Sequence, residues 1–298
     1  MTHITVERDA LGADQIKKAV AAAKKARPVY GTLLDFYEKL LVAQEASMEE
    51  THLEPIEIPP EILSIQEKEG FPLINTRDFA IDVTASEGLL RKFCQFAAES
   101  NKVLAEAAKK IIASLDQGAL AVADLFSKIL KEDDTYWGEV ENRLEIDKKI
   151  LAFAAYSSIR PSLRACSDQL ARYLHKEKQW PKGYCPVCGS PPALSILRGE
   201  GERFLLCSFC GHEWRTHRLC CPFCENRDQK TMHYFFSDEE KDCRVDVCDQ
   251  CKKYVKTIDT RKMKRPMHPY VEQISTLHLD MLAREKGLES GIALWLQI

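Results

Sequence analysis

Eight cysteines, arranged as four Cys-x-x-Cys pairs, constrain the fold of this chain more than any other feature. The pairs are Cys185/Cys188, Cys207/Cys210, Cys221/Cys224 and Cys248/Cys251. In each pair a tight turn places two sulfurs side by side, and two such turns together supply the four thiolates of a tetrahedral metal site. The spacing therefore predicts that metal ions organise the C-terminal part of the chain.

A disulfide scaffold and a thioredoxin-like redox motif are the two alternative interpretations of the pairs. Small disulfide-rich folds belong mainly to exported proteins, and the segment Met1–Ile4 has neither the basic nor the apolar stretch of an export signal. A redox motif would lie beside a strand–helix–strand unit, and no such pattern surrounds any of the four pairs. Metal binding is the interpretation that the sequence favours.

Sequential grouping of the pairs gives two modules. Module one (residues 181–219) would use Cys185, Cys188, Cys207 and Cys210, and module two (residues 220–265) would use Cys221, Cys224, Cys248 and Cys251. Each has the spacing of a rubredoxin or zinc ribbon, and we favour this grouping over a cross-braced one because strand-like segments separate the pairs. The Cys₄ shell suits iron and zinc alike, so two tetrahedral ions of either metal are predicted.

The two modules differ in the residue that follows each pair. Gly189 and Gly211 follow the pairs of module one, whereas Glu225 and Lys252 follow those of module two. Glycine adopts positive φ without strain, which lets backbone N–H groups turn toward the sulfurs. We therefore predict that module two holds its ion less tightly.

The remaining cysteines are predicted not to bind metal. Cys220 adjoins the first ligand of module two, and Cys243 is expected in a strand. Cys94 and Cys166 lie on apolar faces of predicted helices and are interpreted as core residues.

Residues 1–180 are predicted to form a helical domain. Apolar residues recur at spacings of three and four within 33–41, as they do on an amphipathic helix. A long helical region is expected from Ser86 to Leu115 and further helices at 120–130 and 137–155. Pro161 is expected to begin another helix, since proline suits the first turn.

The sequence changes character at Trp180–Gly183, which is the predicted domain boundary. Beyond it short strands are expected at 204–206, 231–236 and 244–247, followed by one helix at 269–287 with Gly287 as its C-terminal cap. The predicted fold class is therefore α+β: a helical domain (1–180), then tandem Cys₄ modules with a terminal helix (181–298).

Charge and motifs limit the function. The formal net charge is −3, which gives no sign of a nucleic-acid partner, although seven of the residues in Lys252–Arg265 are basic. That segment is expected to be a solvated loop or strand edge, with a nucleic-acid contact as the alternative. No apolar run approaches the roughly 20 residues of a membrane span. No nucleophile elbow, Walker loop or dinucleotide fingerprint is found, and a closed Cys₄ shell leaves no position for substrate, so an enzyme is not expected.

The C-terminal half resembles the FdhE-type formate dehydrogenase accessory proteins. The resemblance rests on Cys185-Pro-Val-Cys188-Gly-Ser-Pro-Pro, the Arg203–Cys210 segment followed by Trp214, and the pairs Cys221-Pro-Phe-Cys224 and Cys248-Asp-Gln-Cys251. Tyr254-Val-Lys-Thr-Ile-Asp259 and Ser275-Thr-Leu-His-Leu-Asp280 also match, whereas the proline-rich stretch at 55–72 does not.

The resemblance implies a cytoplasmic accessory protein that binds the catalytic subunit of a molybdenum- or tungsten-pterin formate dehydrogenase during its maturation. It also implies two rubredoxin-type modules joined to a helical domain, with iron at the cysteine sites. Two other functions stay open from the residues alone: a nucleic-acid-binding zinc-ribbon protein that uses 252–265, and an iron Cys₄ redox protein.

Overall fold

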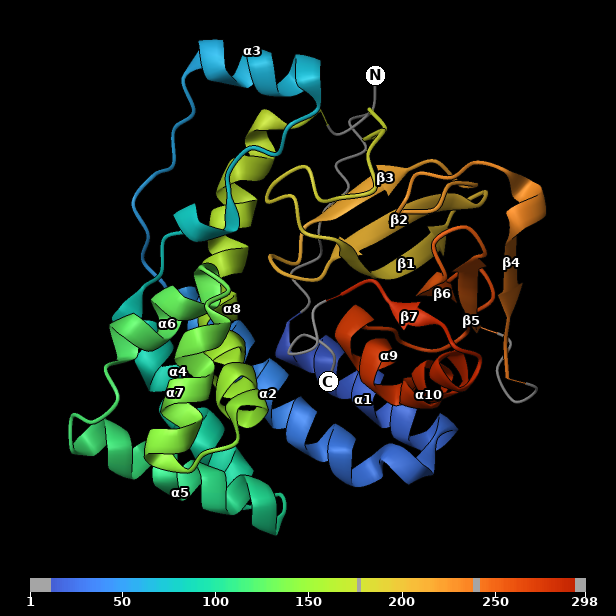
Figure 1. The fold of residues 1–298 in the computed structure, drawn as a ribbon. Helices are drawn as coiled ribbons and strands as arrows, with labels where there is room; N and C mark the ends of the chain where they lie inside the picture. Colours follow the sequence, from blue (N-terminus) through green and yellow to red (C-terminus); the bar gives the residue numbers. More distant parts are fainter. Residues whose placement is uncertain (1–11, 176–177, 238–241, 293–298) are drawn as a thin grey trace.

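The computed structural model describes residues 12–175, 178–237 and 242–292. Helices of the first half lie on one side of the molecule and a sheet from the second half on the other, with the two C-terminal helices between the sheet and α1 (Figure 1). The fold is thus α+β, as predicted.

Ten α-helices are assigned in the described residues. They are α1 (Ala13–Ala26), α2 (Gly31–Glu50), α3 (Pro60–Glu69), α4 (Val83–Ala98), α5 (Lys102–Asp116), α6 (Val122–Leu130), α7 (Asp134–Leu144), α8 (Lys148–Leu170), α9 (Pro269–Ser275) and α10 (Leu277–Glu285). The helices α2, α4 and α8 contact one another and enclose Phe36, Phe93 and Phe153, whose rings meet edge to face or tilted.

The predicted helical region from Ser86 to Leu115 is two helices rather than one. Asn101 interrupts it, because its side chain accepts a hydrogen bond from the backbone N–H of Leu104 and so caps the start of α5. Asp147 caps α8 in the same way and divides the region predicted as one helix at 137–155.

The prediction that Pro161 begins a helix is wrong, because Pro161 lies inside α8. A proline there has no N–H for the carbonyl oxygen four residues earlier, which is that of Ser157. The Gln44 side chain of α2 supplies the missing donor: its Nε2 lies 2.7 Å from that oxygen in a buried contact. A side chain distant in sequence thus makes an interior proline tolerable.

We expect Gln44→Leu to lower the free energy of unfolding by about 1–3 kcal/mol, since it leaves a buried carbonyl without a donor. In a Pro161→Ala background the helix supplies its own N–H, so the same substitution should cost clearly less. Equal losses in both backgrounds, measured by denaturant unfolding, would show that Gln44 acts independently of the proline.

In the part of the chain that the structure describes, seven strands form a single sheet in the order β3-β2-β1-β6-β5-β4, with β7 paired to β6. They are β1 (Pro192–Arg198), β2 (Glu202–Cys207), β3 (Glu213–Thr216), β4 (Met232–Phe235), β5 (Cys243–Cys248), β6 (Lys253–Asp259) and β7 (Glu289–Ser290). Strands β1–β3 belong to module one and β4–β6 to module two. A parallel ladder between β1 and β6, from Leu194↔Lys256 to Leu197↔Asp259, joins the modules into one continuous sheet.

Only the second half of the basic segment Lys252–Arg265, residues 260–265, is the expected solvated loop. The first half of the segment is β6, which lies inside the sheet, and all but its first residue are buried. Five of its seven cations lie within 4.0 Å of a carboxylate: Lys252, Lys256, Arg261, Lys262 and Arg265. Most of its cations therefore have a carboxylate partner within the chain, which weakens the nucleic-acid interpretation.

The helix predicted at 269–287 is also divided. Thr276 separates α9 from α10, and its hydroxyl donates to the Glu272 carbonyl oxygen at 2.6 Å, a local bond that competes with the helical pattern. Gly287 adopts φ 71° just beyond α10, as expected of a C-terminal cap.

Within the described residues, none of the helices combines the length and the apolar character needed to cross a bilayer.

Candidate metal centres

The eight paired cysteines come together as two groups of four. One group is Cys185, Cys188, Cys207 and Cys210, and the other is Cys221, Cys224, Cys248 and Cys251. Within each group all sulfurs lie within 4.8 Å of one another. The grouping is the sequential one, and the cross-braced alternative is not observed.

The sulfur separations fit a tetrahedral metal ion. In module one Cys188 Sγ lies 3.5 Å from Cys207 Sγ and 3.6 Å from Cys210 Sγ. In module two the Cys221–Cys251 separation is 3.7 Å. A tetrahedron with metal–sulfur bonds of about 2.3 Å has edges of about 3.8 Å, whereas a disulfide would bring two sulfurs to about 2.05 Å. The donor sets are therefore suited to zinc or iron, and all of these cysteines are free thiols.

The same turn recurs after each pair. Gly189, Gly211, Glu225 and Lys252 all have positive φ, between 58° and 77°. In module two the N–H of Glu225 donates to the Cys221 carbonyl, and the N–H of Lys252 donates to the Cys248 carbonyl. In module one the N–H of Gly189 donates to the Cys185 carbonyl in the same way. Module two therefore has the same turn conformation, and for each of its two non-glycine residues this conformation costs about 1–2 kcal/mol.

Backbone and side-chain donors point at the sulfurs. In module one the N–H groups of Phe209 and Cys210 both lie 3.4 Å from Cys207 Sγ. In module two burial opposes ionisation of Cys248, but donors led by the Asn226 amide, 3.5 Å from the sulfur, lower the pKa of this thiol to about 7. Such donors favour the thiolate, the form that binds a metal.

Burial distinguishes the two modules. All four cysteines of module one are buried, whereas in module two Cys224 is exposed and Cys251 is half-buried. Greater access and the two strained turns act in the same direction, so the structure supports the prediction that module two holds its ion less tightly.

We expect a chelator to release one ion per chain from module two at least tenfold faster than the second ion, since about 1–2 kcal/mol per strained turn corresponds to roughly tenfold. Lys252→Gly should slow this first release by removing strain, whereas the matched Lys252→Ala keeps the strain and should not. Release in one step, or mass-spectrometric mapping of alkylation at Cys188 before Cys224, would contradict the ranking.

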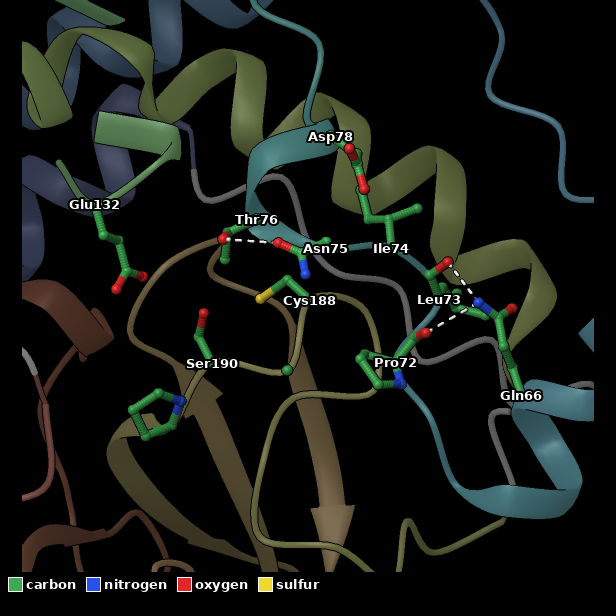
Figure 2. Close-up of a pocket in the computed structure, with 12 residues that line it drawn as sticks. Gln66, Pro72, Leu73, Ile74, Asn75, Thr76, Asp78, Glu132, Cys188 and Ser190 are labelled. Carbon is green, nitrogen blue, oxygen red and sulfur yellow. Dashed lines mark hydrogen bonds between the residues drawn. The ribbon is translucent and has the colours of Figure 1, made fainter. Parts of the chain in front are cut away.

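Module one is docked onto the helical part of the chain through its first turn. The backbone N–H groups of Leu73 and Ile74 donate to the carbonyls of Pro186 and Val187, both at 2.9 Å. The segment that contains Leu73 is fastened in turn by Gln66, whose Nε2 donates to the carbonyl oxygens of Pro72 and Leu73 (Figure 2).

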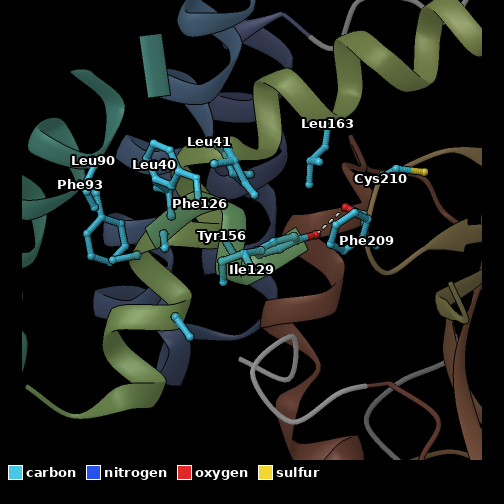
Figure 3. Close-up of a cluster of buried hydrophobic side chains, with 14 of the residues drawn as sticks. Leu40, Leu41, Leu90, Phe93, Phe126, Ile129, Tyr156, Leu163, Phe209 and Cys210 are labelled. Atoms are coloured by element: carbon cyan, nitrogen blue, oxygen red, sulfur yellow. Dashed lines mark hydrogen bonds between the residues drawn. The ribbon is translucent and has the colours of Figure 1, made fainter. Parts of the chain in front are cut away.

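The second turn of module one is held by α8. The Tyr156 hydroxyl points at this turn, 2.7 Å from the carbonyl oxygens of both Ser208 and Phe209 (Figure 3). The Phe209 ring packs between Tyr156 and Phe79. Cysteines of module one consequently belong to the same buried cluster as the helices.

A groove of about 660 Å³ borders module one between its first turn and the segment 72–78 (Figure 2). Asp78 and Glu132 line it together with Cys188, which at 5 % is the most exposed of the four sulfur donors of this module.

The other cysteines lie outside both groups. Cys94 and Cys166 are buried on α4 and α8, and burial raises the pKa of these thiols to about 12 and about 11. Cys220 and Cys243 are buried as well, and Cys243 begins β5.

Sequence reasoning missed the residues that dock module one. Tyr156 resembles any aromatic residue of a helix core, and the backbone contacts of Leu73 and Ile74 depend on no particular side chain. The available signal was the proline-rich stretch at 55–72, just before Leu73, whose prolines are not compatible with one continuous helix.

Two family models match the chain: the FdhE central domain at residues 184–218 and the FdhE C-terminal domain at residues 219–295. A "Protein FdhE homolog" of Aquifex aeolicus is 36% identical over 152 residues, which are 50% of this chain and 52% of the relative. One of Haemophilus influenzae is 26% identical over 249 residues, 80% of this chain and 75% of the relative. The match thus spans about half of the Aquifex protein.

The crystal structure of the FdhE protein from Pseudomonas aeruginosa has the same fold, with a TM-score of 0.68 over 97% of this chain and 96% of that one, at 19% identity. Residues 184–295 thus match the FdhE central and C-terminal domains, and the whole chain shares its fold with an FdhE protein.

Proposed function

We propose that this protein is a non-catalytic accessory factor that binds the catalytic subunit of a formate dehydrogenase and is needed for its maturation. The observation that supports this role most directly is the pair of closed Cys₄ groups within a chain that matches the two FdhE domains. Closed shells organise a surface and leave no coordination position for a substrate. A reducing compartment such as the cytoplasm would keep all twelve cysteines free.

The eight paired cysteines would hold two ions, iron or zinc. A bound ion would supply the cross-link that fixes each pair of turns, because neither turn is joined to its partner by a covalent bond. In module one the ion would also fix the turns that Leu73, Ile74 and Tyr156 contact. The metal would thereby hold the sheet and the helices as one binding body.

Deleting the gene in its host should abolish formate dehydrogenase activity while the catalytic subunit is still synthesised. Wild-type protein should restore the activity, and Cys220→Ser, which alters no member of either group, should restore it too. Cys207→Ser should not. Full activity in the deletion strain would refute the proposed role.

Direct contact is tested by anaerobic capture of the tagged protein, with metal analysis of the eluate. We expect the catalytic subunit to co-elute with wild type and to be lost with Cys207→Ser. Restored activity without co-elution would leave the maturation role standing and contradict the contact.

A further inference from the structure

Two neighbouring cavities lie where α2, α8 and the second turn of module one meet. The inner cavity has a volume of about 40 Å³ and the outer one about 290 Å³. Their walls share Leu41, Arg160 and Tyr270, so Arg160 faces both.

Within the described ranges, Arg160 has no carboxylate in direct contact, although Glu45 in the same outer wall attracts it from farther away. Its guanidinium stacks on the Tyr270 ring, 3.7 Å from the centroid. Among the described residues no carboxylate lies within 4.0 Å of it, whereas Arg164 and Arg198 in the same outer wall pair with Glu45 and Glu213. A partly buried cation without a counterion in direct contact is stabilised when an anion joins it.

Three buried polar atoms around these cavities have no hydrogen-bond partner in the described part of the chain. Tyr37 Oη and Ser208 Oγ line the inner cavity, and His268 belongs to the outer wall with its Nδ1 unpaired. These residues are 3 %, 8 % and 3 % exposed. Burial raises the pKa of Tyr37 and lowers that of His268 to about 3, so both are neutral groups able to donate a hydrogen bond.

The size and lining of the cavities define the ligand. One water needs roughly 10–15 Å³ of such space, so the inner cavity has room for about three heavy atoms, the number in a carboxylate group. The outer cavity is lined in part by apolar side chains, among them Met48, Leu206 and Met267. Arg164 and Arg198, 32 % and 36 % exposed, connect it with solvent.

We propose that these cavities bind a small organic acid. Its carboxylate would occupy the inner cavity against Arg160, Tyr37 and Ser208, and its apolar body would lie in the outer cavity against Met48, Leu206 and Met267. The site does not depend on the proposed maturation role.

The thiolates of module one are the competing counterion for Arg160, since Cys210 belongs to the outer wall. The two arrangements differ in their consequences. If the carboxylate is the counterion, Arg160→Gln weakens ligand binding and leaves the metal in place. If the thiolates are the counterion of Arg160, Arg160→Gln releases metal, and no carboxylate binds to the wild-type protein.

The test is calorimetric titration of the full metal-loaded chain with a series from formate to hexanoate, and with hexanamide as the uncharged match. We expect one carboxylate per chain, tighter binding for longer acids, and at least tenfold preference for hexanoate over hexanamide. Arg160→Gln should weaken hexanoate binding at least tenfold and Tyr37→Phe several-fold, since hydrogen bonds to a charged group are the stronger ones.

Arg91→Gln is the matched control, because Arg91 forms an exposed ion pair with Asp116 on the helical side, and it should bind hexanoate like wild type. Equal affinity for hexanoate and hexanamide, unchanged binding in both Arg160→Gln and Tyr37→Phe, or no carboxylate binding at tens of millimolar would each overturn the proposal.

Discussion

Cys207→Ser is expected to remove the ion of module one and to unfold that module. Metal binding at a structural Cys₄ site contributes on the order of 10–16 kcal/mol, as much as the whole stability of an ordinary domain. Cys207 is 1 % exposed and accepts two backbone N–H groups, so no water replaces its sulfur easily. The effect should extend into α8, because Tyr156 anchors on the turn that follows Cys207.

The measurement is hydrogen exchange of the full chain together with its metal content. We expect the variant to retain one ion, in module two, and to lose protection in β1–β3 and around Tyr156. Cys220→Ser is the matched control, since Cys220 is also buried but belongs to neither group, and it should retain two ions. Wild-type protection in a Cys207→Ser variant that has lost its ion would contradict the account.

Glu272→Gln is expected to lower the free energy of unfolding by about 3–5 kcal/mol, the second-largest effect of a single substitution that we predict. Glu272 is fully buried on α9 and pairs with Arg265 at 2.7 Å and with Arg27, at the end of α1, at 3.6 Å. Arg27 also donates to Ser275 at 3.1 Å. Replacing the carboxylate by an amide preserves shape but leaves two enclosed guanidinium groups facing each other.

Glu99→Gln is the control for this substitution, because Glu99 forms an exposed ion pair with Lys39 and such pairs contribute about 0–1 kcal/mol. Chemical denaturation of both variants, with metal content held equal to wild type, gives the comparison. Losses of similar size would show that the Glu272 cluster does not connect α1 to α9 as the structure indicates.

The cysteine groups could be predicted from the sequence because their constraint is local. A pair separated by two residues has one compact geometry, and strands between the pairs favour sequential grouping. The weaker metal binding of module two could be predicted for the same reason. The turn after each pair needs positive φ whichever residue occupies it, and in module two that residue is Glu225 or Lys252.

The missed features all depend on partners distant in sequence. Lys256 looks like part of a solvated basic run, but its ammonium group lies 2.6 Å from Asp280, which lets β6 pass through the sheet interior. Pro161 looks like a helix start until Gln44 supplies the donor that it lacks. No spacing rule links Tyr156 to a cysteine turn some fifty residues later.

The claim on which the account depends is that each group of four sulfurs holds one metal ion. X-ray absorption spectroscopy and elemental analysis of the full chain, isolated anaerobically with reductant, test it directly. We expect two ions per chain, each with four sulfur neighbours at about 2.3 Å. A metal-free chain with a fully protected sheet, or ions surrounded by nitrogen and oxygen, would contradict it.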